Sequence, residues 1–373
     1  MMAPKKMIRV LVVDDSALMR KLIPQLLERD NSIHVVGTAM DGEFALKKID
    51  EFKPDAITLD LEMPRMDGIE TLRQIMHHHQ VPVVVVSAHT REGASTTFKA
   101  LHMGAFDFVA KPQNVLNEGM SEIADELIAK IKAAVSSPFT RRPLLPVSSG
   151  VVSKPKPKRS VVAGPASKVV AIGISTGGPN TLEYMLSHLP PEFPAAILVV
   201  QHMPAGFTET FARRLNDSCN LEVKEAQSGD LLSAGRVLVC PGDRHMRVRR
   251  MPLGDVVVLS DDAKMNGHRP SVDVLFRSVA QEFGADAVGL LMTGMGEDGA
   301  EGLGVMKACG SLTIAQDESS SVVFGMPRAA IERGYASRVV SLDALPNTLI
   351  AHCGLLRNLT VKETYPVRPV GQL

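Results

Sequence analysis

Five short apolar runs alternate with five segments of helical spacing in the first 136 residues, and this alternation restricts the fold more than any other feature of the chain. The apolar runs cover residues 8–13, 33–38, 56–60, 81–86 and 106–109, and the helical segments cover residues 18–29, 42–51, 69–79, 94–103 and 121–135. Strands that alternate with helices pair in parallel, and the helices then cover both faces of the sheet. The pattern therefore predicts an α/β domain over residues 1–136.

A second alternating pattern begins at Val169, after a segment of different composition. Residues 137–168 are rich in Pro and Ser and contain seven basic residues and no acidic one. Prolines and like charges favour an extended linker, although the stretch "KPKPKR" could instead contact an acidic partner. Beyond it we expect a second α/β domain over residues 169–360, with a β-rich excursion near residues 221–260, and then a C-terminal tail over residues 361–373. The predicted strands of this second domain begin at Val169, Ala196, Val237, Val256, Ala287 and Leu312.

Charge and composition exclude several classes of protein. The 41 basic and 41 acidic residues cancel, so no long-range attraction to nucleic acid is expected. The longest apolar runs fall short of the roughly 18 residues that a transmembrane helix needs, so we expect no membrane insertion. Four scattered cysteines and the absence of a secretory signal pattern predict a cytoplasmic protein with reduced thiols.

Polar side chains end the strands of the first domain. The first strand ends in Asp14 and Asp15, the third in Asp60 and the fourth in Ser87, and Lys111 follows the fifth. Because the carboxyl ends of parallel strands meet at one edge of the sheet, we expect these groups to lie together. Three carboxylates repel one another, and hard oxygen ligands suit Mg²⁺. A single strand-end aspartate would be read as a helix N-cap, but the full set favours a cation and phosphoryl pocket.

The first domain resembles the receiver domain of two-component response regulators, through "VVDDS", "LDLEMPRMDG", "VVVVSA" and "FVAKP". The resemblance implies a flavodoxin-like fold in which Asp60 is the phospho-acceptor. It also implies that Asp15, Asp60 and the backbone carbonyl of Glu62 hold Mg²⁺, with Asp14 in support. The serine and lysine at the fourth and fifth strand ends would contact the phosphoryl oxygens. Phe108 would stand where receivers often carry an aromatic switch residue.

The second domain opens on a serine among glycines. Ser175 lies in "GISTGG", directly after the apolar run that begins at Val169. The pattern G-x-S-x-G exposes a nucleophilic serine at a sharp turn between a strand and a helix. A glycine-rich turn that opens a helix can also hold a phosphate on its free N–H groups, or be only a turn. The six residues alone leave these three interpretations open.

A serine nucleophile needs a base and an orienting carboxylate. The candidate bases are His188, His202, His245, His268 and His352. Only His202 directly follows a predicted strand, which places it at the same sheet edge as Ser175. Asp298 follows another predicted strand in "MTGMGEDG", where it could also be a helix N-cap. This order of serine, histidine and aspartate differs from the α/β-hydrolase order, which would make His352 the base.

Both domains together resemble the chemotaxis response regulator protein-glutamate methylesterases, the CheB family. The motifs are "IGISTGG", "QHMPAGFTETFARRL", "PGDRHM", "HRPSVDVLF", "MTGMGEDGAEG" and "LTIAQDESSSVVFGMPRAAI". The resemblance implies a Rossmann-like methylesterase domain in which Ser175 is the nucleophile, His202 the base and Asp298 the orienting acid. Met295, through its backbone N–H, and Thr176 would form the oxyanion site. The family more often has alanine where Ile174 stands here.

The resemblance also implies a function and its partners. The substrates would be methylated chemoreceptors, whose glutamate methyl esters are hydrolysed with release of methanol, and specific receptor glutamines would be deamidated. A chemotaxis histidine kinase would donate the phosphoryl group, Mg²⁺ would be needed in the receiver, and the esterase would need no cofactor. The unphosphorylated receiver would cover the active-site entrance. Five arginines could hold an acidic receptor helix but more simply form a solvated rim: Arg244, Arg247, Arg249, Arg250 and Arg269.

Two rival functions remain to be weighed. A response regulator could carry a DNA-binding output domain, but the sequence contains no helix-turn-helix pattern or basic recognition helix. The "GISTGG" turn could bind a nucleotide, but the acidic ribose ligand expected about 20 residues later is missing. The sequence therefore favours a phosphorylation-controlled serine esterase.

Overall fold

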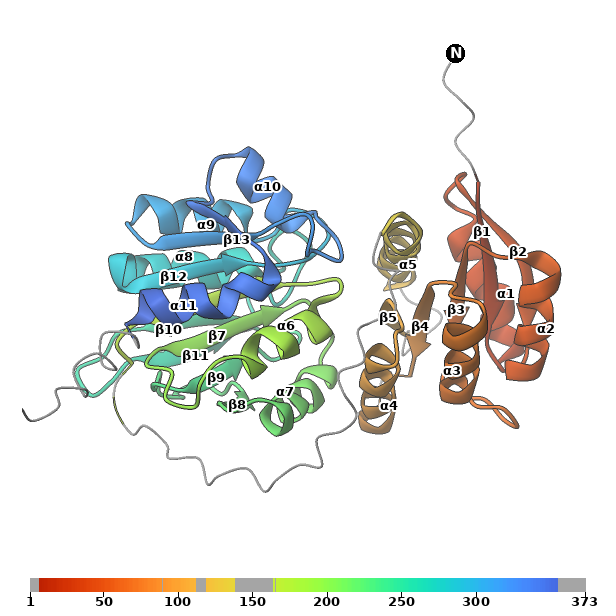
Figure 1. Cartoon of the computed structure of the whole chain (residues 1–373), viewed down its shortest axis with the longest axis horizontal. Helices are drawn as coiled ribbons and strands as arrows, with labels where there is room; N and C mark the ends of the chain where they lie inside the picture. The colour runs from red at the N-terminus through yellow and green to blue at the C-terminus, as the bar shows by residue number, and fades with distance from the viewer. Residues whose placement is uncertain (1–6, 89, 112–118, 138–163, 165, 355–373) are drawn as a thin grey trace, which may run out of the picture.

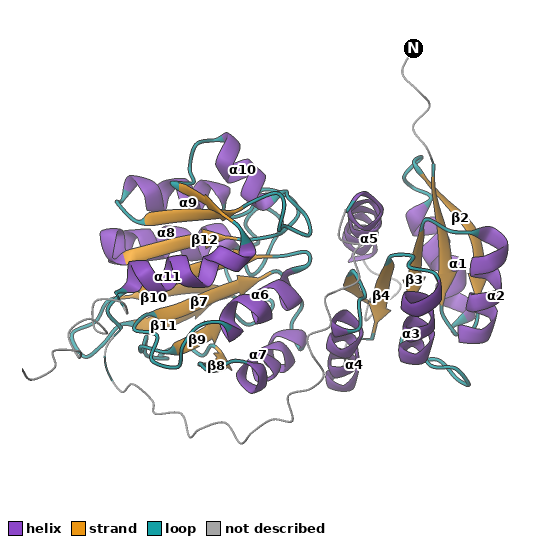
Figure 2. Ribbon diagram, in the orientation of Figure 1, coloured by secondary structure: helices purple, strands orange, loops and turns teal. Residues whose placement is uncertain are grey.

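The structure is a computed structural model that describes residues 7–88, 90–111, 119–137, 164 and 166–354. Most of the predicted linker and the whole predicted C-terminal tail lie outside the described residues. Figure 1 shows two α/β domains side by side, and Figure 2 shows helices on both faces of each sheet. The prediction of two parallel-sheet α/β domains is confirmed. No helix in the described part of the chain is long and apolar enough to cross a membrane.

The N-terminal domain has a five-stranded parallel sheet in the order β2-β1-β3-β4-β5. Its strands are β1 (Ile8–Val13), β2 (Ile33–Ala39), β3 (Ala56–Leu59), β4 (Val83–Ser87) and β5 (Asp107–Ala110). Its helices are α1 (Ala17–Leu27), α2 (Gly42–Phe52), α3 (Gly68–His78), α4 (Arg91–His102) and α5 (Gly119–Ser136). This order is that of flavodoxin-like folds. Each predicted element is confirmed to within three residues at either end.

Aspartate caps help to explain why the first domain's helices begin where they do. The carboxylate of Asp41 accepts from the N–H of Phe44 at the start of α2, and Asp67 accepts from the N–H of Glu70 at the start of α3. An N-cap of this kind satisfies one of the backbone donors that a helix leaves free. The helices then pack on the sheet in two layers, with α1 and α5 on one face and α2, α3 and α4 on the other.

The C-terminal domain has a seven-stranded parallel sheet in the order β14-β13-β12-β6-β7-β9-β8. These strands are β6 (Val169–Ile174), β7 (Ala196–Gln201), β8 (Glu222–Glu225), β9 (Arg236–Val239), β12 (Ala287–Leu291), β13 (Leu312–Gln316) and β14 (Arg338–Val340). The helices are α6 (Gly178–Ser187), α7 (Phe207–Ser218), α8 (Val272–Phe283), α9 (Ala300–Ala308), α10 (Met326–Glu332) and α11 (Leu345–Cys353). Short 3₁₀ turns lie at Gly284–Asp286 and Leu342–Ala344. The order of connection reverses between β6 and β12, and ligands of open α/β sheets bind at such a point.

The predicted β-rich excursion near residues 221–260 is confirmed by β8, β9 and two further strands, and the domain differs from the prediction in the place of the run at Val256 and in two short elements. The run at Val256 forms β11 (Val256–Ser260), which pairs with β10 (His245–Arg249) in an antiparallel hairpin outside the main sheet. The helix α10 and the edge strand β14 were not predicted, because α10 is only seven residues long and β14 only three. Elements this short carry too few residues for a period to be read.

Aromatic rings of the two domains stack on one another. Phe98 and Phe108 belong to the first domain, and Phe207 and Phe211 belong to α7. Phe98 stacks on Phe211 with ring centroids 5.4 Å apart, and Phe108 stacks on Phe207 at 4.8 Å. All four side chains are buried, and the apolar core is continuous across this contact. The α4–β5 side of the first domain is thus fixed against the second domain, as Figure 1 shows.

Polar contacts surround these rings. The guanidinium of Arg214 in α7 donates to the carbonyl of Phe98 and to Nδ1 of His102, each at 3.0 Å. The side-chain amide of Asn180 in α6 donates to the carbonyl of Leu101 at 2.8 Å. The interface therefore combines a stacked apolar centre with directional bonds to the end of α4.

Candidate active site and phosphorylation pocket

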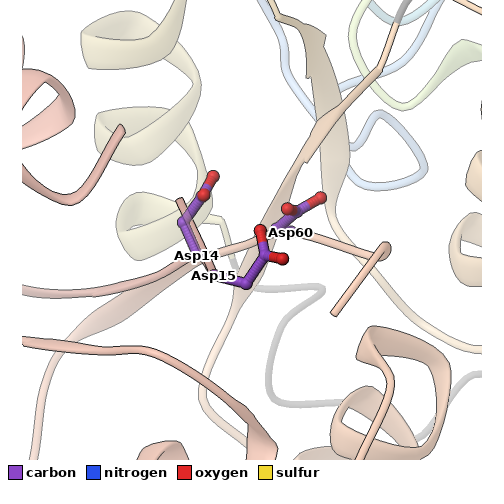
Figure 3. Close-up of side chains that lie close together, drawn as sticks. All are labelled: Asp14, Asp15 and Asp60. Carbon is purple, nitrogen blue, oxygen red and sulfur yellow. The ribbon is translucent and has the colours of Figure 1, made fainter. Parts of the chain in front are cut away.

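The three predicted carboxylates of the first domain lie together at the carboxyl edge of its sheet. Oxygens of Asp14, Asp15 and Asp60 all lie within 4.8 Å of one another, and Figure 3 shows the three side chains grouped there. Lys111 reaches the same place from the end of β5, with Nζ 2.7 Å from Asp60 and 3.0 Å from Asp14. Three oxygen donors at this spacing fit a hard divalent cation such as Mg²⁺. The carboxylates of Asp15 and Asp60 can therefore hold the predicted ion.

Ionisation in this pocket is opposed by burial. Burial raises the pKa of Asp60 to about 6, although Lys111 acts in the opposite direction. Burial would lower the pKa of Lys111, but its contacts with Asp60 and Asp14 raise it overall. The pKa of Asp60 therefore lies close to neutral pH. A cation bound beside it would strongly favour the ionised form of this carboxylate.

Ser87 lies at the end of β4 as predicted, but its hydroxyl is directed toward α4. It donates to the carbonyl of Gly93 at 3.3 Å and accepts from the hydroxyl of Thr97 at 2.6 Å. Reaching a phosphoryl group on Asp60 would require Ser87 to exchange these partners. If the Ser87 hydroxyl turned toward Asp60, the first turns of α4 would lose these hydrogen bonds.

The turn between β6 and α6 presents Ser175 at the carboxyl edge of the second sheet. Gly177 has φ +73°, and a Cβ there would lie 2.5 Å from the side chain of Val322. A residue with a side chain would fit neither the backbone conformation nor the space. The N–H of Ser175 donates to the carbonyl of Thr293 at 3.0 Å, which joins this turn to the loop after β12.

His202 follows β7, which is the neighbour of β6. Its backbone N–H donates to the carbonyl of Ile174 at 3.1 Å, so His202 and Ser175 are the first residues beyond two adjacent strands. Nε2 of His202 lies 2.8 Å from a carboxylate oxygen of Asp298. A carboxylate only accepts, so Nε2 carries the proton and Nδ1 presents a lone pair. Among the described residues Nδ1 is buried without a hydrogen-bond partner, and no hydrogen bond joins it to Ser175.

The carboxylate of Asp298 is almost fully buried and is surrounded by donors. Its partners besides His202 are the hydroxyl of Ser271 at 2.7 Å, the N–H of Val272 at 2.7 Å, the amide of Asn266 at 3.0 Å and, more weakly, the N–H of Asp273 at 3.4 Å. Burial alone would raise the pKa of Asp298, but the bonds from His202, Ser271 and Val272 hold it below its ordinary value. The start of α8 adds the positive end of a helix dipole. Asp298 is therefore a fixed negative charge hydrogen-bonded to Nε2 of the imidazole.

Three polar side chains of this site were missed by the sequence analysis. Ser271 and Asn266 bond Asp298, and the buried amide of Gln201 donates to the carbonyl of Ser175 at 3.0 Å. Gln201 also explains Gly178, where a Cβ would lie 2.1 Å from the amide oxygen. The Asn-Gly dipeptide at residues 266–267 was a readable signal for a tight turn, but nothing in the sequence shows where that turn points.

Two backbone N–H groups near Ser175 have no acceptor. Within the described part of the chain, the N–H groups of Thr176 and Met295 donate no hydrogen bond. Gly294 brings the β12 loop close to the serine, because a Cβ on it would lie 2.9 Å from the Cβ of Ser175. Free donors beside a nucleophile are what an oxyanion site requires.

Three of the other candidate histidines lie elsewhere or have structural partners, whereas the ring of His268 stacks on that of His202. The pKa of His352 is lowered by burial and by Lys168 and Arg338, which lie at the amino ends of β6 and β14. His352 is therefore at the opposite edge of the sheet from Ser175, which removes the α/β-hydrolase order. His188 bonds the carbonyl of Tyr184 at the end of α6. Buried His245 bonds the carbonyl of Ala263 and accepts from the N–H of Ser271.

Four of the five arginines noted in the sequence have acidic partners of their own. Arg269 pairs with Asp243, Arg247 with Asp262, Arg244 with Asp261 and Arg250 with Asp286. This pairing favours the solvated rim over a dedicated clamp for an acidic helix.

Comparison with known proteins gives matches in both halves of the chain. Residues 170–349 match the CheB methylesterase family and residues 10–120 match the response regulator receiver domain. A protein-glutamate methylesterase/protein-glutamine glutaminase of Koribacter versatilis is 63% identical, covering 94% of this chain and 97% of that protein. A protein of the same name from Sulfurimonas denitrificans is 49% identical, covering 90% of this chain and 96% of its own.

Among solved structures, the Thermotoga maritima CheB methylesterase catalytic domain is 40% identical, covers 50% of this chain and 98% of that chain, and aligns with a TM-score of 0.49. The two full-length relatives match this chain across both domains. The chain therefore belongs to the CheB family of protein-glutamate methylesterases that carry a response regulator receiver domain.

Proposed function

We propose that this protein hydrolyses glutamate methyl esters on chemoreceptors, with release of methanol, and that Ser175, His202 and Asp298 carry the reaction. The observation that supports this most directly is the His202–Asp298 hydrogen bond of 2.8 Å, which leaves a lone pair on Nδ1 beside the strand end that bears Ser175. The relatives that match over both domains are named for this activity and for protein-glutamine glutaminase activity.

Acylation follows from the tautomer. Nδ1 of His202 takes the proton of the Ser175 hydroxyl as its oxygen attacks the ester carbonyl, and Asp298 stabilises the imidazolium that forms. The N–H groups of Met295 and Thr176 donate hydrogen bonds to the oxyanion that forms. His202 then returns the proton to the departing methoxide, so methanol leaves and an acyl-serine remains.

Deacylation repeats these steps with water as the nucleophile. Nδ1 takes a proton from water, the hydroxide attacks the acyl carbonyl, and Ser175 recovers its proton from His202. The product is a glutamate side chain. A glutamine side chain forms the same acyl-serine with ammonia as the leaving group, which accounts for deamidation at the same site. The receptor side chain changes from neutral to anionic in both reactions.

The receiver supplies the control. We propose that a chemotaxis histidine kinase donates a phosphoryl group to Asp60, and that Asp15, Asp60 and the carbonyl of Glu62 would hold a Mg²⁺ ion, whose positive charge would offset the negative charge of the phosphoryl group. Lys111 then pairs with the phosphoryl oxygens, and Ser87 leaves its partners in α4 to join it. Since α4 and Phe108 make the contact with α7, their movement weakens the contact between the receiver and the second domain.

One receiver carboxylate also faces the nucleophile turn. Asp107 precedes Phe108 in β5, its Oδ2 is buried without a hydrogen-bond partner among the described residues, and the N–H of Gly177 is close enough to oppose the rise in its pKa that burial causes. Gly177 is two residues from Ser175. A receiver held here restricts access to the nucleophile, so we expect deletion of residues 1–136 to raise the unphosphorylated rate. A truncated protein no faster than the full chain would count against this control.

The test is methanol release from methylated receptor membranes, with and without a small phosphodonor and Mg²⁺. The full chain should release methanol and do so faster with the phosphodonor. Ser175→Ala should lower kcat by about 10⁴ or more, as in other serine triads. The matched control is Ser187→Ala, which removes a hydroxyl that bonds the carbonyl of Tyr184 and Nδ1 of His188 at the far end of α6. Full turnover by Ser175→Ala would remove the assignment of the nucleophile.

A further inference from the structure

A tight turn from the segment before α8 lies over the proposed catalytic pair. Met265 and His268 exchange two backbone hydrogen bonds, of 3.0 and 2.9 Å. Between them Asn266 has φ +54° and Gly267 has φ +79°. Two successive positive φ angles define a type I′ turn, for which Asn-Gly is the preferred sequence. The direction of the side chains on this turn is therefore set by the backbone.

The base of this turn is fixed as well. The guanidinium of Arg269 donates to one carboxylate oxygen of Asp243 at 2.9 and 2.6 Å. It also donates to the carbonyls of Asp261 and Asp262, at 2.9 and 3.1 Å. One side chain thus ties the start of the segment to its end. The tip is held in one place, although most of its residues are exposed.

Two side chains of the tip reach the site. Asn266 donates to Asp298 at 3.0 Å and to Asp273 at 2.8 Å. The ring of His268 lies parallel to the ring of His202, with centroids 3.9 Å apart and planes 10° apart. The turn therefore contacts the carboxylate with one residue and the imidazole with the other.

We propose that His268 is a positioning residue that fixes the plane of the His202 ring by stacking on it, so that the unpartnered Nδ1 is kept available to Ser175. The inference rests on the function proposed above. Asp298 holds the ring through Nε2 alone, and the second side-chain torsion of histidine has a broad energy well. One hydrogen bond therefore leaves the ring free to tilt about it. A parallel ring at van der Waals distance removes that tilt without taking up Nδ1.

The charge of His268 suits this role. The titratable groups that face it are His202 after β7, Asp298 in the β12 loop, Lys264 in its own segment and Glu126 in α5 of the receiver. Burial and His202 lower the pKa of His268 to about 4, against the weaker opposing effects of Asp298 and Glu126. His268 is therefore neutral near pH 7. A neutral ring can stack on the His202 imidazolium of the transition state, whereas a charged ring would repel it.

The experiment compares His268→Ala with His268→Phe in the full chain, with methylated receptor membranes and a phosphodonor. Alanine removes the stacked plane, and phenylalanine keeps a plane without an ionisable group. We expect His268→Ala to lower kcat about tenfold with KM within about twofold, because a small displacement of a reacting group costs this much or more. We expect His268→Phe to stay within about threefold. The control is His188→Ala, which removes a histidine whose ring packs at a tilt of 42° against Tyr184 outside the site.

A second readout does not depend on turnover. Long-range ¹H–¹⁵N spectra should show the Nε2–H tautomer of His202 in all three proteins, because Asp298 sets it, whereas the ring signals of His202 should broaden in His268→Ala alone, because only there is the ring free to tilt. Circular dichroism checks that each variant is folded. A His268→Ala enzyme within twofold of native, or an equal loss in both variants, would overturn the stacking role. Ser175→Ala and His202→Ala are run alongside: if they retain turnover, the proposed triad itself fails, whereas if they are inactive and His268→Ala is not impaired, only the present inference fails.

Discussion

Asp60 and Asp298 lie at the carboxyl edges of the two parallel sheets, with exposed fractions of 2% and 3%, yet their ionisation differs. Burial raises the pKa of Asp60 to about 6, with Lys111 and the N–H of Glu62 as its opposing partners. Asp298 is as buried, but its hydrogen bonds outweigh burial and lower its pKa. The comparison shows that two equally buried carboxylates differ in pKa because of the donors and charges around them: Asp298 has more donors, and Asp60 has Asp14 beside it.

The difference matches what each site has to do. Asp60 must change its charge state, because it first binds a cation and then carries a phosphoryl group. Few donors oppose its burial, so its ionisation responds strongly to both events. The esterase carboxylate must stay ionised while His202 gains and loses a proton. A helix start, a serine and an asparagine hold that charge without taking part in the reaction.

The largest expected effect comes from the same substitution made at both positions. Asp298→Asn keeps the shape but removes the charge that stabilises the imidazolium, and its amide group opposes the surrounding donors. We expect kcat to fall by about 10⁴ in methanol-release assays, as in other triads that lose this charge. Asp60→Asn should abolish only the increase that a phosphodonor produces. If Asp298→Asn kept more than a tenth of native activity, the contrast between the two sites would be lost.

A second prediction uses the raised pKa of Asp60. Mg²⁺ must displace a proton whenever the pH is below about 6, so the fraction of carboxylate available to it falls about tenfold between pH 7 and pH 5. The apparent Mg²⁺ affinity of the full chain should weaken by about that factor, as measured by titration calorimetry.

The control for this prediction is Asp60→Asn, which should bind Mg²⁺ more weakly at every pH but with less dependence on pH. An affinity for the native protein that stays constant from pH 7 to pH 5 would show that Asp60 is already ionised there. The two buried aspartates would then be alike.

The smallest expected effect concerns the contact between α4 and α7, through which the phosphorylation pocket would influence the esterase site. Arg214→Ala removes the hydrogen bonds to the carbonyl of Phe98 and to His102, and bonds from a charged group contribute about 1.5–3 kcal/mol when well formed. Because Arg214 is partly exposed, we expect only about a fivefold rise in the unphosphorylated methanol-release rate, with the phosphorylated rate unchanged. The matched control is Arg213→Ala, whose side chain pairs with Glu209 in the same helix. An equal effect of both variants would argue against this link.

Much of the site could be read from the sequence because strands alternate regularly and end at one edge. Asp14, Asp60 and Lys111 follow three strands of one parallel sheet, and the structure brings them together as predicted. His202 and Asp298 meet for the same reason. The partners of Ser87 could not be foreseen, because they depend on how far α4 reaches toward the end of β4.

The sequence by itself determined the two sheets, the edge at which each site lies, and the polar residues that the strands carry to that edge. It could do so because the alternation of strands and helices is a local property of the chain, and the carboxyl ends of parallel strands share one edge of the sheet whatever their order. Only the tertiary structure decided the tautomer of His202, the donors around Asp298, the stacking of His268 and the ring contacts between α4, β5 and α7. These depend on loops and surfaces far apart in the chain, whose meeting is set by packing and leaves no periodic trace in the sequence.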